Sequence, residues 1–412
     1  MAKKTASPLM ICAPNPGDHY DPILDLSGKV FGGSRGYFGW QQYCHDGYID
    51  GSSYDWDASR IALAGSQLAG HIGVWKYATR VGQARLITGG IGIVMTHGEY
   101  RKAGLASKTM AATIESMREL GYDLSVLFGI RNFYGRFGFT QAWPDCTVEL
   151  PGDKVWPGRP TLRRRRGDMV QLLRAQGEVG RIYNRDYADR VGAADRPVYT
   201  LDLHRWRLDE LIDRQKKVRG YLATQVDGTT LRIWEVGGFT TPAGCAELLG
   251  HIQQLARESK CAAVVLQLGL GHPLLEPLRR TGCKISLEYI GDGGAMVLVV
   301  NLASALTKLS GELTRRLAAS PLARYSGALA IQLNEQRATL AIQRGQVSLA
   351  QRAIKATARL SGGPDVARLL IGADAPTVVI QAGGIKCAGN AALLAEALFP
   401  ARSPFLPRAD WF

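Results

Sequence analysis

The pattern of apolar and polar residues is clearest between residues 87 and 130, where an uncharged stretch is followed by an amphipathic one. Residues 87–96 combine glycines with mostly β-branched residues, which is typical of a buried strand. After a polar segment, apolar residues recur from Leu105 to Gly121 at close to helical spacing and predict a helix with one buried face. Residues 123–130 form a second apolar run. We therefore expect a strand, a loop, a helix and a second strand in this order.

Weaker patterns around this unit predict further short elements. In the first 150 residues they indicate a strand at 8–13, a helix at 20–31, antiparallel strands at 61–63 and 67–75, and a closing strand at 147–150. Residues 32–57 are aromatic, glycine-rich and acidic, and predict a long irregular loop. Its aromatic rings either anchor the loop or line a pocket for a cationic substrate together with carboxylates. The carboxylates are those of Asp46, Asp50, Asp55 and Asp57.

The rest of the chain shows a similar alternation of strand-like and helical segments. In residues 168–300 the pattern predicts strands at 198–203, 220–226, 231–236 and 262–268, and a helix at 241–258. In residues 301–412 it predicts a helix at 302–318, strands at 328–333, 338–343 and 347–350, and helices at 361–372 and 390–398.

A segment at 151–167, dense in proline, glycine and arginine, predicts a linker. For its run Arg163–Arg166 we consider three alternatives: the side chains are solvated, they form salt bridges between domains, or they bind an anion. A chain of 412 residues is too long for one hydrophobic core. We expect three domains, at residues 1–150, 151–300 and 301–412, with α/β and α+β folds.

The composition narrows the classes of function. A formal net charge of +14 suits an anionic partner, but no nucleic-acid-binding motif presents the arginines, so nucleic acid is not an expected partner. The seven cysteines are scattered without a C-x-x-C pair, which argues against a disulfide framework and a zinc site. No stretch resembles a signal peptide or approaches the ~20 apolar residues of a membrane span. We expect a cytoplasmic protein with no membrane attachment and no metal.

The polar segment after the first predicted strand has the composition of a phosphate-binding loop. It consists of Arg101, Lys102, Ala103, Gly104, Leu105 and Ala106. Glycine lets the backbone turn so that successive N–H groups point outward, and the small Ala106 allows a ligand to come close. The predicted helix begins here, and its unpaired amides and dipole favour a pyrophosphate. Arg101 and Lys102 can neutralise phosphate charge.

Two motifs together resemble a known family. The pattern R-x-x-G-x-A at residues 101–106, after a glycine-rich strand, is similar to the acyl-CoA pyrophosphate loop of GNAT N-acetyltransferases. The run F-Y-G-R-F-G-F at residues 133–139 resembles the Y-G-R-F-G-[FY] sequence of Eis-type (enhanced intracellular survival) acetyltransferases. The alternative is an ordinary βαβ unit, with Gly104 as a turn residue and Tyr134 in the core.

The resemblance implies two tandem GNAT-like domains, each a mixed β-sheet flanked by helices, followed by a sterol-carrier-protein-like α+β domain. It also implies acetyl-CoA as co-substrate, with its acetyl and pantetheine groups against Val94, Met95 and Thr96. The second domain has no R-x-x-G-x-[GA] in the corresponding place, so we expect it to lack a CoA site. Because Eis-type proteins form hexamers, we expect a homo-oligomer.

Acetyl transfer from a thioester to an amine requires a polarised carbonyl, a deprotonated amine and a proton for the leaving thiolate. We expect backbone amides to polarise the carbonyl where residues 93–96 open away from the neighbouring strand. Tyr134 is the expected general acid, because a phenol with a pKa near 10 is protonated at neutral pH and the family has a tyrosine here. Tyr100 is a chemical rival, but it lies toward the other end of the coenzyme.

The resemblance implies that the carboxylate of the C-terminal residue, Phe412, enters the first domain and accepts the proton of the amine. A free carboxylate with a pKa of about 3.5 is a weak base for an ammonium group, so burial or an intervening water must assist it. His97, at a strand end, is a rival base. No G-x-S-x-G or Cys–His arrangement supports a covalent intermediate, so we expect direct transfer in a ternary complex.

The acceptor implied by the resemblance is a primary amine of a polyamine-like small molecule, of which aminoglycosides are the Eis-type example. Asp25, Trp40 and Asp410 are the expected substrate contacts. A protein lysine is the nearest alternative acceptor. From a different class of protein, the third domain also fits a lipid or sterol carrier with a vestigial transferase domain.

Overall fold

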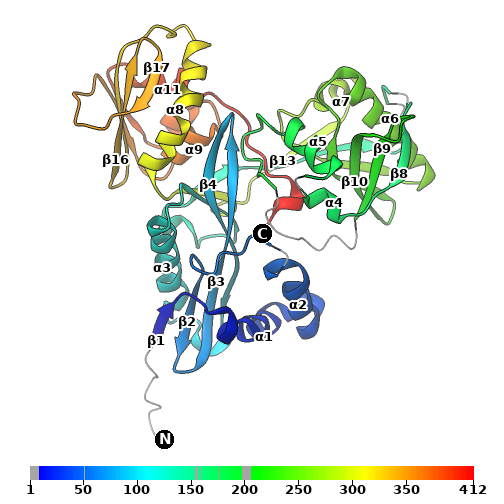
Figure 1. Ribbon diagram of the computed structural model, residues 1–412, viewed down its shortest axis with the longest axis horizontal. Helices are drawn as coiled ribbons and strands as arrows, with labels where there is room; N and C mark the ends of the chain where they lie inside the picture. Colours follow the sequence, from blue (N-terminus) through cyan, green and yellow to red (C-terminus); the bar gives the residue numbers. More distant parts are fainter. Residues whose placement is uncertain (1–8, 51, 154–155, 159, 175, 197–205) are drawn as a thin grey trace, which may run out of the picture.

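Three β-sheets, each in a lobe of its own, organise the chain (Figure 1). The computed structural model describes residues 9–50, 52–153, 156–158, 160–174, 176–196 and 206–412. The predicted strand at 198–203 lies outside these residues. Among the helices of the described part, none has the length and apolar character needed to cross a bilayer.

The first sheet lies in the blue-to-cyan lobe of Figure 1. Its strands are, in order across the sheet, β1 (Leu9–Cys12), β2 (Arg60–Ala64), β3 (Gln67–Val81), β4 (Ala84–Thr96), β5 (Leu124–Gly129), β14 (Gly294–Val299) and β6 (Thr140–Trp143). Strands β4 and β5 are parallel, and the crossover between them is α3 (Leu105–Glu119). The predicted strand–loop–helix–strand unit is therefore confirmed.

Helices cover both faces of this sheet. Met110 and Ile114 of α3 join one apolar cluster, and Ile23 and Leu26 of α1 (Pro16–Arg35) join the cluster on the opposite face. Asn15 caps α1 by accepting a hydrogen bond from the N–H of Gly17. The expected irregular loop at 32–57 is largely wrong, because the chain continues through α2 (Tyr37–Tyr43) into a π-helical segment (Cys44–Ile49). The aromatic residues there recur at helical spacing, which composition alone had hidden.

The second sheet, in the green lobe, has the same order of strand types. Across the sheet its strands are β8 (Arg163–Arg166), β9 (Arg207–Ile212), β10 (Val218–Asp227), β11 (Thr230–Gly237), β12 (Ala263–Gln267), β7 (Asp145–Pro151) and β13 (Lys284–Glu288). Its helices are α4 (Val170–Leu173), α5 (Glu178–Asp186), α6 (Pro242–Glu258) and α7 (Leu275–Thr281). As in the first sheet, one parallel pair (β11 with β12) is joined by a helix, here α6.

The arginine run at 163–166 belongs to this sheet rather than to a linker. It forms the edge strand β8, antiparallel to β9. Arg164 pairs with Glu258 and Arg165 with Glu210, so these ion pairs lie within the second lobe. The linker prediction failed here because arginine is compatible with an exposed sheet edge, where its side chain can reach neighbouring carboxylates.

The first two sheets exchange one strand. β7 follows β6 in the chain but pairs with β12 and β13, whereas β14 follows β13 but pairs with β5 and β6. The prediction that residues 147–150 close the first domain is therefore wrong. A segment at 151–300 would contain β14 of the first sheet and lack β7 of the second. An apolar run predicts a strand but does not identify the strand that pairs with it.

The third lobe (yellow to orange in Figure 1) combines a mixed sheet with helices. Across its sheet the strands are β17 (Gln346–Leu349), β16 (Gln336–Gln343), β15 (Gly327–Leu333), β18 (Ala358–Gly362) and β19 (Lys386–Ala388). Its helices are α8 (Leu302–Ala318), α9 (Val366–Ile371), α10 (Pro376–Ala382) and α11 (Ala391–Leu398). The helix expected at 361–372 is wrong in its first half, where β18 ends and a turn follows. The likeness to a sterol carrier stays a prediction.

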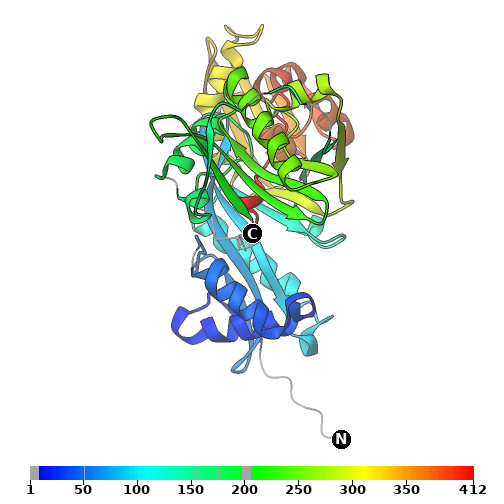
Figure 2. The ribbon, with the colours of Figure 1, turned by 90° about the vertical axis from the view of Figure 1, so that its right-hand side faces the viewer.

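The C-terminal tail (residues 400–412) leaves α11 and runs between the other two lobes (Figures 1 and 2). The N–H of Phe405 donates to the carbonyl of Val191 in the second lobe. A short 3-10 helix, η5 (Arg408–Asp410), then turns the chain toward the first sheet, where the Trp411 ring stacks on Phe128 at 4.0 Å between centroids. The chain thus ends against the first sheet.

The exchanged strand β14 predicts a stability effect that crosses the expected domain boundary. Met296 is buried in an apolar cluster with Met110 and Ile114 of α3. We expect Met296→Ala to destabilise the first domain by about 2–5 kcal/mol, because it leaves a cavity in that core. Thermal unfolding measures the loss. Leu287→Ala on β13, where the side chain is 44% exposed, is the control and should change stability by less than about 0.5 kcal/mol. An equal effect of both variants would contradict this role of β14.

Candidate active site

The loop between β4 and α3 presents several backbone N–H groups together. Lys102 and Gly104 have φ values of 65° and 73°, in the left-handed region, so neither residue continues a strand or a right-handed helix. Among the hydrogen bonds of the described residues, none uses the backbone N–H of Lys102, Ala103 or Gly104. The 15-residue helix α3 begins at Leu105, and the backbone N–H groups of its first turn have no partner within the helix. Such a concave set of donors binds anions.

Strands β4 and β5 separate before either of them ends. Their parallel pairing stops at Ile91 and Leu127, whereas β4 continues to Thr96. At the separation Ile93 has a φ of 44° and the register with β3 shifts, so β4 bulges. The bulge takes residues 93 and 94 out of the regular pairing with β3, and both line the space beside the gap. The predicted opening of residues 93–96 is present in the structure.

A buried histidine holds this bulge. His71 on β3 has Nδ1 2.9 Å from the carbonyl oxygen of Ile93 and Nε2 2.7 Å from the hydroxyl of Tyr54. A carbonyl only accepts hydrogen bonds, so Nδ1 carries the proton, and in the neutral ring Nε2 accepts from the tyrosine hydroxyl. Burial lowers the pKa of His71 to about 4, which keeps the ring neutral. No pattern in the sequence distinguishes His71 from the other histidines.

A cavity of about 790 Å³ joins the loop, the gap and the aromatic turn after β5. Nine of the predicted residues line it: Val94, Thr96, Arg101, Lys102, Gly104, Leu105, Ala106, Tyr134 and Phe412. We call it the main cavity. Two of the residues predicted to bind the coenzyme do not line it. Met95 is buried on the other side of β4, as strand alternation requires, and Ala103 lies outside the lining.

Tyr134 lies at the wall of the main cavity. It precedes the 3-10 turn η3 (Gly135–Phe137), and its ring rests against Gly129, where a Cβ would come within 2.5 Å of Cδ2. Burial raises the pKa of the Tyr134 phenol to about 12. The hydroxyl is therefore protonated at neutral pH and able to donate.

Phe412 occupies the other wall, against the bare backbone of β4. A Cβ on Gly90 would lie 2.6 Å from Cε1 of Phe412, so glycine makes room for this ring. Tyr77 and Phe128 surround it, at 5.8 and 5.6 Å between ring centroids. The last residue of the chain and Tyr134 thus line the same cavity. Phe128 is a lining residue that an apolar strand pattern could not distinguish from the core.

The predicted substrate contacts separate in the structure. Trp40 lines a side cavity of about 200 Å³ next to the main one, together with Phe31, Tyr43, Ile93, Arg408, Trp411 and Phe412. Asp25 lines neither cavity; it accepts a hydrogen bond from Tyr37 and pairs with Lys29 at 2.6 Å.

Asp410 requires a correction. It is completely buried and ion-paired with Arg196, so it is no substrate contact. The family resemblance had implied a substrate contact here, but the polypeptide turns at η5, so that Asp410 and Phe412 contact different lobes.

The carboxylates expected around a cationic substrate also lie elsewhere. Asp46, Asp50, Asp55 and Asp57 line neither cavity. Asp55 instead accepts hydrogen bonds from Tyr122 and the N–H of Ala58. Of the rival catalytic groups, His97 is outside the lining, and Tyr100 lies in the main cavity beside the loop, with its hydroxyl 3.1 Å from Gln67.

Comparison with known proteins shows which protein family the first lobe resembles. Residues 16–142 match the model of the acetyltransferase (GNAT) domain. The matched residues run from α1 into β6 of the first lobe. The match supports an acyltransferase enzyme that uses acyl-CoA. No curated protein matches this chain in sequence.

Solved structures resemble the whole chain in fold. A GCN5-related N-acetyltransferase from Anabaena variabilis has 17% identity and a TM-score of 0.76, over 98% of this chain and all of that chain. A probable N-acyltransferase from Enterococcus faecalis has 16% identity and a TM-score of 0.73, with the same coverage. Eis1 from Mycobacterium abscessus has 14% identity and a TM-score of 0.69, again with the same coverage. At these identities the likeness concerns the fold, and it supports the predicted tandem GNAT-like architecture followed by an α+β domain.

No cluster of three or more histidine, cysteine, aspartate or glutamate side chains that could hold a metal ion occurs within the described ranges.

The buried His71 predicts a pH dependence of stability. Its pKa in the folded chain, about 4, lies below the ordinary 6.5. Between these values the unfolded chain binds the extra proton, so stability is complete above about pH 6.5 and falls by about 3 kcal/mol as the pH drops to about 4. We expect His71→Asn, which retains a donor near the Nδ1 position, to show a shallower decline in urea unfolding. Equal slopes for the two proteins would contradict this role of His71.

Proposed function

We propose that the chain is an acetyl-CoA-dependent N-acetyltransferase that transfers the acetyl group directly to a primary amine of a small molecule. One observation carries the proposal: the phosphate-binding loop, the gap between β4 and β5, Tyr134 and the C-terminal Phe412 line a single cavity. These are the parts that thioester aminolysis needs, arranged from one end of the coenzyme to the other.

The residues of the loop fit a CoA pyrophosphate. The N–H groups of Lys102, Ala103 and Gly104 are available as donors, and Arg101 and Lys102 add two positive charges. A Cβ on Gly104 would meet open space, so the backbone is accessible from the cavity. The gap between β4 and β5 then receives the pantetheine arm, because the strand edges there have backbone groups without sheet partners.

The bulge at Ile93 is the group best placed to polarise the thioester carbonyl. Residues 93 and 94 leave the regular pairing at the bulge, and His71 fixes the bulge by donating to the Ile93 carbonyl. Donors that are already oriented need no rearrangement as charge develops on the carbonyl oxygen, which is the main advantage of such a site.

Tyr134 serves as the general acid in this proposal, and the Phe412 carboxylate serves as the base. The raised pKa of the Tyr134 phenol favours the protonated form that a leaving thiolate needs. The carboxylate of Phe412 belongs to a residue whose ring packs against Tyr77 and Phe128 at the wall of the main cavity. It accepts a proton from the amine directly or through a water molecule.

The side cavity supports a small amine as acceptor. Its volume of about 200 Å³ accommodates a compact group close to Phe412. The polyamine-like acceptor stays part of the proposal, but its charge must be met by the chain end rather than by the acidic residues at 46–57. A lipid carrier has less support, because Leu329, Ile331 and Leu340 pack into the core with α8.

Removing the phenol tests the general acid. We expect Tyr134→Phe to lower kcat by about 100-fold or more and to leave the KM for acetyl-CoA nearly unchanged, because the proton donor acts on the leaving thiolate. Thiol release with a panel of amines measures this. Tyr100→Phe is the matched variant and should retain most of kcat. Full turnover by Tyr134→Phe would remove the assignment.

Changing the chain end tests the base. Deletion of Phe412 places the carboxylate on Trp411, and we expect kcat to fall by about 100-fold because a displacement of even ~1 Å is costly at a reacting centre. Phe412→Leu retains a terminal carboxylate at the same position and should keep a larger share of kcat. If both variants lose the same activity, the ring rather than the carboxylate is what the site requires.

A further inference from the structure

The second sheet repeats the geometry of the active-site strands without their catalytic residues. β11 pairs in parallel with β12 over four residues that end at Ile233, as β4 pairs with β5 over four residues that end at Ile91. Both strands bulge just beyond this point. Two residues past the last pair, the first sheet has Ile93 at the proposed acyl site. The second sheet has Glu235 at the same offset, where β11 is again in register with Ala223 beyond its bulge.

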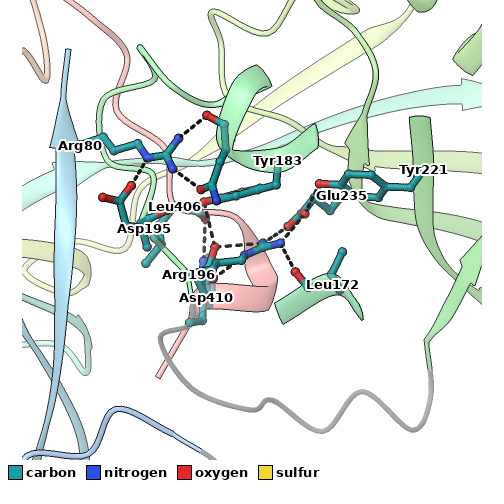
Figure 3. A network of polar contacts seen from close by, with 12 residues as sticks. Arg80, Leu172, Tyr183, Asp195, Arg196, Tyr221, Glu235, Leu406 and Asp410 are labelled. Atoms are coloured by element: carbon teal, nitrogen blue, oxygen red, sulfur yellow. Dashed lines mark hydrogen bonds and ion pairs between the residues drawn. The ribbon is translucent and has the colours of Figure 1, made fainter. Parts of the chain in front are cut away.

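Glu235 fills this place with a buried ion cluster. Arg196 lies fully buried and donates through both terminal nitrogens to the Glu235 carboxylate, and Nη1 also donates to the carbonyl of Leu172. The hydroxyl of Tyr221 donates to Oε1 of Glu235 at 2.6 Å. Figure 3 shows these groups converging from separate segments of the second lobe. Where the first sheet leaves a gap for a ligand, the second sheet holds a fixed positive group.

The tail supplies the second carboxylate of this cluster. Asp410 accepts hydrogen bonds from Nε and Nη2 of Arg196 at 2.9 and 3.0 Å, and its Oδ2 lies 3.3 Å from the hydroxyl of Tyr183 (Figure 3). The ring of Tyr183 also lies against the guanidinium, at 3.7 Å from its centroid to Cζ. The tail segment therefore binds the second lobe by a charge-assisted, two-point contact in a buried site.

The cluster is also linked to the first sheet. Arg80 on β3 donates to Asp195, next to Arg196, at 2.6 Å and to the carbonyl of Asn184 at 3.1 Å. Beyond Asp410 the chain crosses back, and Trp411 stacks on Phe128 while Phe412 enters the main cavity. Only one residue separates the ion-paired aspartate from the terminal residue. A shift at Asp410 must therefore move the chain end.

We propose that the second domain serves as the binding site for the chain's own C-terminus, with Arg196 and Asp410 as positioning residues that set the place of the Phe412 carboxylate. The inference rests on the proposed function, in which that carboxylate accepts the proton of the amine.

Replacing Asp410 by asparagine tests the inference with the smallest change of shape. Asp410→Asn keeps the side-chain volume and leaves Arg196 paired with Glu235. Glu312→Gln is the matched control, because Glu312 is a buried carboxylate paired with Arg316 at 2.6 Å in α8, far from the tail in sequence and outside both cavities. Thermal unfolding of both variants measures the general effect of removing a buried charge.

Two readouts follow the tail itself. The first is the rate at which carboxypeptidase A, which removes aromatic C-terminal residues, releases Phe412 from the full chain. The second is the kinetics of thiol release. We expect Asp410→Asn to release Phe412 about tenfold faster or more and to lower kcat by about tenfold or more with an unchanged KM for acetyl-CoA, whereas Glu312→Gln changes neither. Deleting Phe412 from Asp410→Asn should then cost little further activity, because both changes act on the same group.

The outcomes separate the two proposals. Release of Phe412 at the wild-type rate from Asp410→Asn, or a loss of kcat equal to that of Glu312→Gln, overturns the positioning role. Faster release from Asp410→Asn together with a wild-type chain that acetylates no amine supports the tail-binding site and removes the proposed function. Faster release together with the specific loss of kcat supports both.

Discussion

The early separation of β4 from β5 is the constraint on which the rest of this structure depends. Parallel strands normally stay paired, because each unpaired backbone group in a buried place costs free energy. Here the pairing ends at Ile91, and the edges beyond it are available to a ligand. The bulge at Ile93, with the His71–Tyr54 pair behind it, keeps the strands apart in a defined way. The loop at Gly104 and the turn at Tyr134 lie at the two ends of this gap.

The second and third lobes together bring the C-terminal tail to this gap. The third lobe ends in the tail, and the second lobe receives it through Arg196 before the chain returns to the first sheet. The exchange of β7 and β14 joins the first two sheets, so the site that binds Asp410 and the cavity that receives Phe412 belong to one connected framework. Buried ion pairs contribute little net stability but define a position sharply. An ion pair of this kind therefore suits Asp410, whose proposed role is to position the Phe412 carboxylate rather than to add binding energy.

The first two lobes share the same order of strand pairing but use it for different purposes. In the first, Gly90 leaves β4 bare, so that the Phe412 ring can lie directly on the backbone. In the second, β11 carries Glu235, which pairs with the buried Arg196. Side chains, not topology, decide whether this geometry is open to a ligand.

The sequence by itself determined the local features. Periodicity placed β4, α3 and β5, and α8 has its predicted bounds, because these segments are long and strongly patterned. Motif spacing also brought out the loop at 101–106 and Tyr134, since the geometry of a phosphate loop depends on residues adjacent in the chain. Segments 32–57 and 163–166 were misjudged because composition there outweighed spacing.

Only the tertiary structure decided which distant segments meet. The exchange of β7 and β14, the pairing of Asp410 with Arg196 and the burial of His71 behind Ile93 each join residues far apart in the chain. The sequence of an apolar strand does not predict which strand it pairs with. The sequence around an aspartate does not predict which arginine forms its ion pair. These choices depend on packing over the whole molecule, which a local pattern cannot encode.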